Sequence, residues 1–110
     1  MAKRFEIKKA VDQQYYFALI ADNNEIILDS ERYVQKQGAL NGVEAVKKNA
    51  QNEARYDRRD GQNGQFYFVL KAANGEVIGR SEQYKTRQGV ESGIAAVKAA
   101  AADAPVKDLT

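Results

Sequence analysis

Acids, amines and tyrosines are the residues that could do chemistry in this chain, because its sequence contains no cysteine and no histidine. That composition excludes thiolate nucleophiles, disulfide bonds, serine–histidine triads and acid–base catalysis by histidine. An enzyme would have to work with Asp, Glu, Lys and Tyr alone, and no grouping of them along the sequence points to a reaction. We therefore expect a protein that is not an enzyme and that uses no cofactor.

Two short polar segments place a carboxylate close to a phenol at the same spacing. They are Ser30-Glu31 with Tyr33, and Ser81-Glu82 with Tyr84. One interpretation is a pair of matched binding sites, in which the Glu and the Tyr of each segment contact a small ligand. The other interpretation is structural: Ser and Glu close a strand-to-helix corner by hydrogen bonds to the backbone, and Tyr packs over the start of the helix.

A second candidate surface joins Tyr16 and Tyr67 with Lys71 and Arg80. Aromatic rings beside positive side chains form the stacking platforms that hold single-stranded nucleic acid. Tyrosine is also common in strands for reasons of packing alone. Weak binding of nucleic acid through Tyr16, Tyr67 and Lys71 is therefore an alternative function, and a net charge of +2 gives it little support.

The sequence predicts neither a metal site nor a membrane span. The acidic stretch Asp22-Asn23-Asn24-Glu25 lacks the ligand number and spacing of a calcium loop, and a hairpin turn explains it better. Apolar runs such as residues 15–21 are far shorter than the ~20 residues that cross a bilayer. A chain of 110 residues without cysteine is expected to form a single domain in the reducing cytoplasm.

These candidate residues belong to an internal repeat. Residues 4–50 align with residues 55–101 without a gap at an offset of 51, and 19 of the 47 positions are identical. The two polar segments are equivalent in this alignment, and so are Tyr16 and Tyr67. We expect one domain of two repeats, about residues 4–52 and 55–103, followed by a short strand within residues 105–109.

Each repeat has the pattern of three strands followed by one helix. In the second repeat, Asn63-Gly64 and Asn74-Gly75 predict type I′ turns, which require positive φ at both central residues. They separate predicted strands near residues 56–60, 65–72 and 76–81. Asp12-Gln13 and Asn23-Asn24 take these places in the first repeat, and we expect the Asp12-Gln13 turn to be looser.

Farther along each repeat the apolar period changes from two to about 3.6, which predicts a helix. Thr86 is expected to cap the second helix, whereas Gln35 is a poor cap for the first. Gly42 and Gly93 lie on the apolar helix faces and indicate close packing there. Those faces are formed by Ala39, Val43, Val46 and Ala50 in the first repeat and by Val90, Ile94, Val97 and Ala101 in the second.

Alternation along the second strand of each repeat separates two faces of a sheet. The face expected to lie against the helices carries Tyr15, Phe17 and Leu19 with Phe66, Phe68 and Leu70. The face expected to be open carries Tyr16, Ala18 and Ile20 with Tyr67, Val69 and Lys71. A partner protein is expected to bind this open face or an edge of the sheet.

The second repeat contains four distinctive motifs, which are Gly64-x-Phe66-Tyr67-Phe68-x-Leu70-Lys71-Ala72, Asn74-Gly75-Glu76, Ser81-Glu82-x-Tyr84 and Gly93-Ile94-x-x-Val97-Lys98. These motifs resemble the YegP-like family, which comprises small, mostly bacterial proteins built on a domain of unknown function. The resemblance covers nearly the whole chain in both repeats, although Gln13, Asn24 and Ile20 of the first repeat depart from the pattern.

The resemblance implies an α+β fold in which two tandem β3-α-β repeats form one antiparallel sheet with the helices on one face. It also implies pseudo-two-fold symmetry, with the strand after each helix exchanged to the other half. The chain around Tyr56–Arg59 would cross to the second half, and Val106–Asp108 would return to the first. Such a chain is expected to be a monomer that acts as a non-enzymatic binding module.

Overall fold

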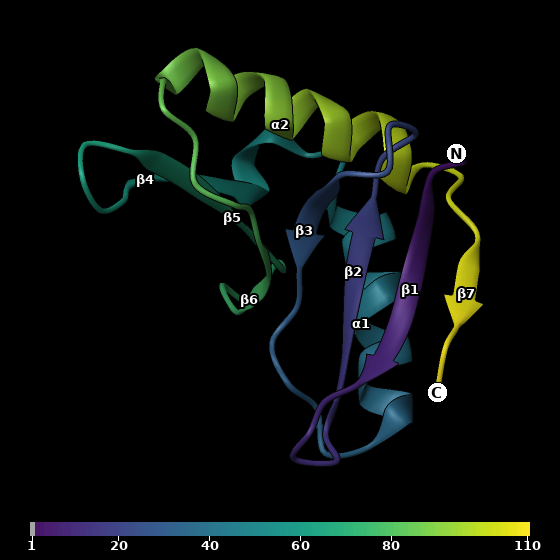
Figure 1. The fold of residues 1–110 in the computed structure, drawn as a ribbon. Coiled ribbons are helices and arrows are strands. Elements are labelled where there is room, and N and C mark those ends of the chain that lie inside the picture. Colours follow the sequence, from purple (N-terminus) through teal and green to yellow (C-terminus); the bar gives the residue numbers. More distant parts are fainter. Residues whose placement is uncertain (1) are drawn as a thin grey trace.

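The computed structural model describes residues 2–110, which form seven strands and two helices (Figure 1). Each repeat contributes three strands and a helix, as predicted. In chain order the elements are β1 (Arg4–Lys9), β2 (Tyr15–Ile20), β3 (Ile26–Asp29), α1 (Lys36–Asn49), the 3₁₀ turn η1 (Glu53–Arg55), β4 (Tyr56–Asp60), β5 (Phe66–Lys71), β6 (Val77–Arg80), α2 (Arg87–Ala101) and β7 (Val106–Asp108).

All seven strands form one sheet in the order β4-β5-β6-β3-β2-β1-β7. The two halves meet at the centre, where Asp29 of β3 pairs with Arg80 of β6 in antiparallel register. These two residues are equivalent in the repeats, so their pairing lies on the pseudo-two-fold axis. The strand pairs are antiparallel except that of β7 with β1, which is parallel. The sheet is therefore mixed, and the predicted α+β fold is otherwise confirmed.

The strands that follow the helices lie where the family resemblance places them. After α1 the chain enters the second half as β4, which pairs with β5. After α2 it returns to the first half as β7, which pairs with β1 (Figure 1). The chain thus covers the edge of β1 with its own C-terminal strand, while β4 forms the opposite edge of the sheet.

The hairpin turns of the second repeat follow the prediction only in part. Asn63 and Gly64 both have positive φ, 55° and 73°, as a type I′ turn requires. In the next hairpin Gly75 alone is left-handed, with φ 88°, and its amide donates to the Ala72 carbonyl at 2.9 Å. This is a type I turn followed by a left-handed residue, so the prediction of a type I′ turn at Asn74-Gly75 is wrong.

The turn at Asp12-Gln13 is not looser than its counterpart. The Gln13 amide donates to the Ala10 carbonyl at 3.0 Å and closes a turn over residues 10–13. In the second repeat the Gln65 amide donates to the Gln62 carbonyl at 3.0 Å and closes a turn over residues 62–65, one position farther along the repeat. Gln13 adopts a φ of 70° to close the turn. The two turns are therefore closed equally tightly but differ in type, because only Gln13 has positive φ in the first, whereas Asn63 and Gly64 both have it in the second.

Both helices pack on one face of the sheet and bury the predicted apolar stripes. Every residue of those stripes belongs to a core shared with Phe17, Leu19, Phe68 and Leu70 of β2 and β5. The Thr86 side chain caps α2 by accepting from the Gly89 amide at 2.9 Å, whereas α1 has no side-chain cap. Within residues 2–110 neither helix is long and apolar enough to span a membrane.

Candidate functional site

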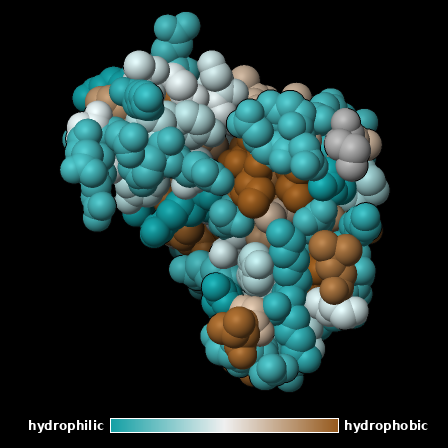
Figure 2. Space-filling model, viewed as in Figure 1, coloured by the Kyte–Doolittle hydropathy of each residue, from teal (hydrophilic) through white to brown (hydrophobic). Residues whose placement is uncertain are grey.

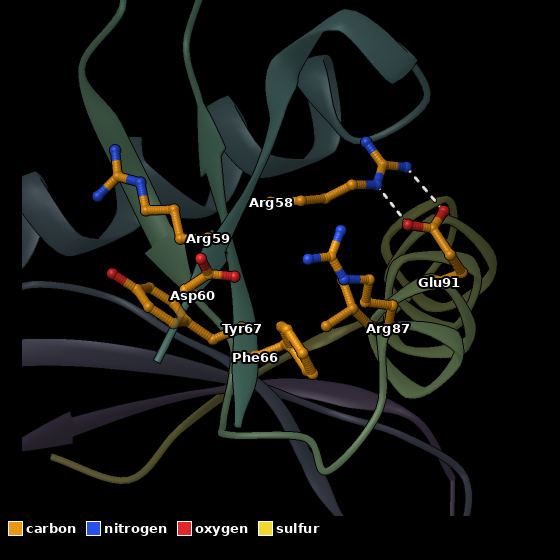
Figure 3. A pocket seen from close by; sticks show the side chains of 8 residues that line it. Arg58, Arg59, Asp60, Phe66, Tyr67, Arg87 and Glu91 are labelled. Carbon is orange, nitrogen blue, oxygen red and sulfur yellow. Dashed lines mark hydrogen bonds and ion pairs between the residues drawn. The ribbon is translucent and has the colours of Figure 1, made fainter. Parts of the chain in front are cut away.

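A hollow lies beside the β4 edge of the sheet, between β4 and the N-terminal turn of α2 (Figure 3). Arg87 reaches toward it from α2, and Asp60 does so from β4. Cations, carboxylates and two aromatic rings therefore share one concave surface. The hollow has a volume of about 210 Å³ and is lined by Arg58, Arg59, Asp60, Phe66, Tyr67, Arg87, Val90 and Glu91.

Tyr56 fixes β4 in position although most of the strand is charged. Its ring is buried edge-on against Phe68, with the centroids 5.7 Å apart, and its hydroxyl donates to the Ala50 carbonyl at 2.7 Å. Burial raises the pKa of Tyr56 well above its usual value, so the phenol stays protonated. One buried residue thus anchors a strand whose other side chains are exposed or half-buried.

The backbone of β4 is available over its second half. No strand within residues 2–110 pairs with the outer side of β4. The Tyr56 amide donates to the Glu53 carbonyl in η1, so this first position is occupied. Phe68 of β5 lies opposite Arg58. Its amide and its carbonyl both bond to Ser81, on the side of β5 that faces away from β4. The amide and carbonyl of Arg58 therefore point outward, as do those of Asp60 two residues later.

The Arg58 side chain links β4 to two other elements. Its guanidinium donates to Glu91 of α2 (Figure 3) and to Glu53 of η1. These hydrogen bonds raise the pKa of Arg58 and lower that of Glu91. The charge of Arg58 is therefore largely compensated by the protein itself.

Arg87 contrasts with Arg58 because no ion pair joins it to a carboxylate within residues 2–110. Its guanidinium carbon lies 5.1 Å from the centroid of the Phe66 ring, which is a cation–π arrangement. The side chain is exposed and borders the hollow. The charge of Arg87 is therefore available to an incoming anionic group.

The equivalent corner of the first repeat is occupied by the C-terminal chain. Lys36, the counterpart of Arg87, pairs with Asp108 of β7 at 2.5 Å. Hydrogen bonds from Lys36 and from Thr110 hold the pKa of Asp108 below its usual range. A carboxylate on an added strand thus neutralises the cation at the start of α1.

The backbone of β7 is held to β1 by bonds at both of its ends. The Phe5 amide donates to the Pro105 carbonyl at 2.8 Å, and the Leu109 amide donates to the Ile7 carbonyl at 2.9 Å. Ile7 is the counterpart of Arg58 in the repeat alignment. The first repeat therefore shows how a strand occupies this edge, which the second repeat leaves uncovered.

Tyr16 and Tyr67 do not form a common platform. They lie on β2 and β5, which are three strand spacings or about 14 Å apart, and on opposite sides of the central Asp29–Arg80 pair. An arginine covers each ring: Arg32 is 4.9 Å from the Tyr16 centroid and Arg80 is 5.6 Å from that of Tyr67. A stacked base would have to displace these arginines.

The open face of the sheet is less open than predicted. Ala18, Ile20 and Val69 on this face are at most 4% exposed. Long charged side chains surround them, such as Lys71, which pairs with Asp57 at 3.3 Å, and the aliphatic stems of such residues shield small apolar neighbours. In Figure 2 the exposed hydrophobic surface around β3 is accordingly bordered by hydrophilic residues.

Tyr33 and Tyr84 pack against the helices, as the structural interpretation expects. A Cβ atom added at Gly42 would lie 2.7 Å from the Tyr33 hydroxyl, and one at Gly93 would lie 2.5 Å from that of Tyr84. This confirms the predicted close packing at both glycines. Burial is the main cause that raises the pKa of each tyrosine, and nearby carboxylates add to it.

Serine closes the strand-to-helix corner in each repeat. Ser30 Oγ accepts from the Phe17 amide at 2.8 Å and donates to the Glu31 carbonyl at 2.8 Å. Ser81 forms the same two bonds in the second repeat. The structural interpretation thus accounts for both serines.

The carboxylates of Glu31 and Glu82 are exposed. Glu82 and Tyr84 border one hollow of about 480 Å³ together with Glu25 from the other repeat. Glu31 borders a different hollow, of about 270 Å³, which is also lined by Asp29 and Arg80 of the central strand pair. Among the described hollows, the structure brings Glu and Tyr of a polar segment together only in the second repeat, and ligand binding by them stays a prediction.

The acidic stretch of the first repeat forms a turn. The Glu25 amide donates to the Asn23 side chain at 3.1 Å, and Asn24 adopts a left-handed φ of 71°. Within residues 2–110 no three carboxylates are grouped in a way that could hold a metal ion.

Arg58 and Arg87 are absent from the sequence-based candidates, which, apart from Lys71 and Arg80, are residues that the two repeats share. Their counterparts are Ile7 and Lys36. The signal that could have found them is a difference between the repeats: an apolar residue lies beside the added strand β7, and an arginine takes its place at the uncovered edge.

Comparison with known proteins gives consistent similarities. The model of the domain of unknown function DUF1508 matches residues 10–57 and 62–108. The chain is 52% identical over 104 residues to a UPF0339 protein of Bordetella pertussis, covering 94% of each, and 47% identical to the UPF0339 protein YegP of Escherichia coli K12 over the full length of both.

Two solution NMR structures resemble the fold closely. They are those of yegP from E. coli, described as a protein of unknown function, and of a UPF0339 protein from Shewanella oneidensis, with TM-scores of 0.93 each. Their sequences are 47% and 41% identical to this chain. The matches cover 100% of this chain and 95% and 93% of theirs.

Proposed function

Since this chain belongs to the family of the domain of unknown function DUF1508, we propose its role from its own geometry: it is a non-enzymatic binding module for an extended segment of a partner protein. The segment adds to the sheet along β4 and pairs with the outward backbone groups of Arg58 and Asp60. Its side chains lie over the hollow beside α2.

The observation that carries this proposal is the difference between two equivalent edges. β1 is covered by β7, whereas β4 has no strand on its outer side within residues 2–110. An unpaired edge offers a row of hydrogen-bonding groups to another chain, and many binding domains take extended segments in this way. Of the two equivalent positions, the one beside β1 is thus closed and the one beside β4 is available for an added strand. The outer side of β7 is the other unpaired edge of the sheet within residues 2–110.

The composition of β4 makes such binding selective. Its sequence, Tyr-Asp-Arg-Arg-Asp, has four charged residues out of five. Charges on an edge strand discourage indiscriminate pairing with other strands. A segment that binds here therefore needs side chains that match these charges.

The proposal assigns no catalytic step to this site. Hydrogen bonds from Lys98 and Arg58 lower the pKa of Glu53, and hydrogen bonds from Arg58 lower that of Glu91. Such carboxylates stay ionised near neutral pH and are poor general acids. We keep the cytoplasm as the expected location, because the chain has no cysteine that would need an oxidising compartment.

Binding of single-stranded nucleic acid is the alternative function. The arginines over Tyr16 and Tyr67 place positive charge beside both rings, which favours it. The separation of the two rings and the pairing of Lys71 with Asp57 count against a continuous positive groove. This alternative predicts an affinity for oligonucleotides that falls steeply with salt concentration.

Photo-crosslinking in the cell tests the proposed function. A photoreactive amino acid replaces Asp60 at the edge in one variant and Tyr16 on the sheet face in another. We expect a crosslink to one extended segment of a partner protein from position 60, and its loss when Arg58→Pro removes the outward amide. Arg58→Ala is the matched control that keeps the amide. Crosslinks from position 16 alone would contradict the proposal.

A further inference from the structure

We propose that the segment bound at β4 runs parallel to β4 and carries a carboxylate beside Arg58 that pairs with Arg87. This inference rests on the proposed function and specifies the chemistry of the partner. Its template is the first repeat, in which β7 runs parallel to β1 and Asp108 pairs with Lys36.

The register of β7 on β1 predicts which residue of the segment meets Arg87. Asp108 lies opposite Ile7 in the parallel pairing, and Ile7 corresponds to Arg58. The residue opposite Arg58 should therefore be the acidic one, because the cation of α2 lies at the position of Lys36. The flanking residues of the segment then bond to the amide and the carbonyl of Arg58, as the Leu109 amide bonds to Ile7.

Charges on either side of this position restrict the rest of the segment. Lys107 of β7 lies opposite Glu6, and the counterpart of Glu6 on β4 is Asp57. Asp57 is already paired with Arg59 at 3.0 Å and with Lys71 at 3.3 Å, so a basic residue immediately before the acidic one is compatible with this position, as Lys107 is in the first repeat. Asp60 lies two residues beyond Arg58 and is exposed, so a second acid opposite it would be repelled.

The start of the edge limits where the segment enters. In the first repeat the Phe5 amide donates to the Pro105 carbonyl. In the second repeat the equivalent Tyr56 amide donates to the Glu53 carbonyl. The 3₁₀ turn η1 thus occupies the place of Pro105. The segment begins its pairing at Arg58 and continues past Asp60 toward the β4–β5 hairpin.

The pattern of a basic residue followed by an acidic one is present in the tail of this chain, as Lys107-Asp108. An acetylated and amidated peptide that copies residues 105–110 is therefore a suitable probe. Added at millimolar concentration to the ¹⁵N-labelled full-length protein, it should shift the amide signals of Arg58–Asp60 and of the first turn of α2. A scrambled peptide should leave these signals unchanged.

Two changes test the carboxylate. Asp→Asn at the position of Asp108 in the peptide should weaken binding about three- to fivefold, as for an exposed ion pair. Arg87→Gln in the protein should weaken binding by the same factor. When both changes are made, binding should be no weaker than with either change alone. Lys36→Gln is the matched control, because it removes the equivalent cation at the edge that β7 already covers, and it should leave the shifts at β4 unchanged.

The outcomes separate this inference from the proposed function. Binding at β4 that is insensitive to Asp→Asn and to Arg87→Gln would overturn the role of the carboxylate while leaving the edge as a binding site. Amide shifts at β1 instead of β4, or no amide shifts, would overturn the proposed sequence of the bound segment. The crosslink from position 60 would then be the remaining test of the proposed function. Shifts at β4 on concentrating the protein without peptide would make a second copy the occupant and overturn the inference.

Discussion

At the scale of single residues, two glycines set how closely the helices approach the sheet. Gly42 and Gly93 face Tyr33 and Tyr84, whose rings lie over the first turns of α1 and α2. Each tyrosine in turn is bridged to the strand in front of it, at Tyr15 and at Phe66. The matching polar segments of the two repeats thus place a tyrosine ring against a glycine, which accounts for the repetition of the tyrosines.

Gly93→Ala should destabilise the protein although alanine favours helix formation. The added Cβ would lie 2.5 Å from the Tyr84 hydroxyl and 3.1 Å from the Phe68 ring. Overpacking of this kind costs about 1–3 kcal/mol, which exceeds the ~1 kcal/mol gain in helix propensity. Urea denaturation measures the change. Ser92→Ala at an exposed position of α2 is the control and should be neutral or slightly stabilising.

The contact with Tyr84 can be separated from other effects of this substitution. Tyr84→Phe removes the hydroxyl that the new Cβ would meet, so Gly93→Ala should be less destabilising in that background. An equal loss in both backgrounds would show that the hydroxyl does not cause the strain.

At the scale of elements, the two helices and the two sheet edges differ in how their ends are completed. α2 has a side-chain cap at Thr86, and α1 has none at Gln35. β7 pairs with β1, whereas on the outer side of β4 the turn η1 bonds to the first residue, Tyr56. The two copies have thus kept the same core while their ends have diverged.

The caps predict opposite effects for equivalent substitutions. Thr86→Ala should lower the free energy of unfolding by about 1 kcal/mol, because the Gly89 amide loses its acceptor. Gln35→Thr should raise it by up to about 1 kcal/mol by supplying the missing acceptor to α1. Thermal and urea denaturation of both variants would check this, and a stabilising Thr86→Ala would contradict the capping role.

Attachment of β7 should depend on pH. The pKa of Asp108 in the folded chain lies below the ~3.9 of an unfolded aspartate. The contribution of its pairing with Lys36 is therefore complete above about pH 4 and is lost as the pH falls through the lower, folded-state pKa. Heteronuclear NOE values of residues 106–110 should accordingly fall in acid before the core unfolds.

The matched variant for this prediction is Asp108→Asn. Its C-terminal strand should have the same lowered NOE values at pH 6 and in acid, since no carboxylate remains to titrate. NOE values that fall equally in both proteins would show that another group controls the attachment of β7.

At the scale of the whole molecule, the ungapped self-alignment predicted the repeats. The apolar periods together with the spacing of the turn residues predicted the strands and the buried stripes. The residue type at the turns was less informative, since Gln13 adopts a left-handed conformation, with φ 70°, that its side chain disfavours. The candidate site was harder still to predict. Arg87 is significant only because β4 lacks the strand that β1 has, and that difference follows from chain topology.

The measurement that tests this account most directly is amide hydrogen exchange of the free, full-length protein at neutral pH. The account predicts slow exchange at Phe5 and Leu109, which bond across the β1–β7 pair, and fast exchange at Arg58 and Asp60 on the outer side of β4. The peptide copying residues 105–110 should then slow exchange at Arg58. Slow exchange at Arg58 and Asp60 in the free protein would contradict the account, because the β4 edge would already be closed.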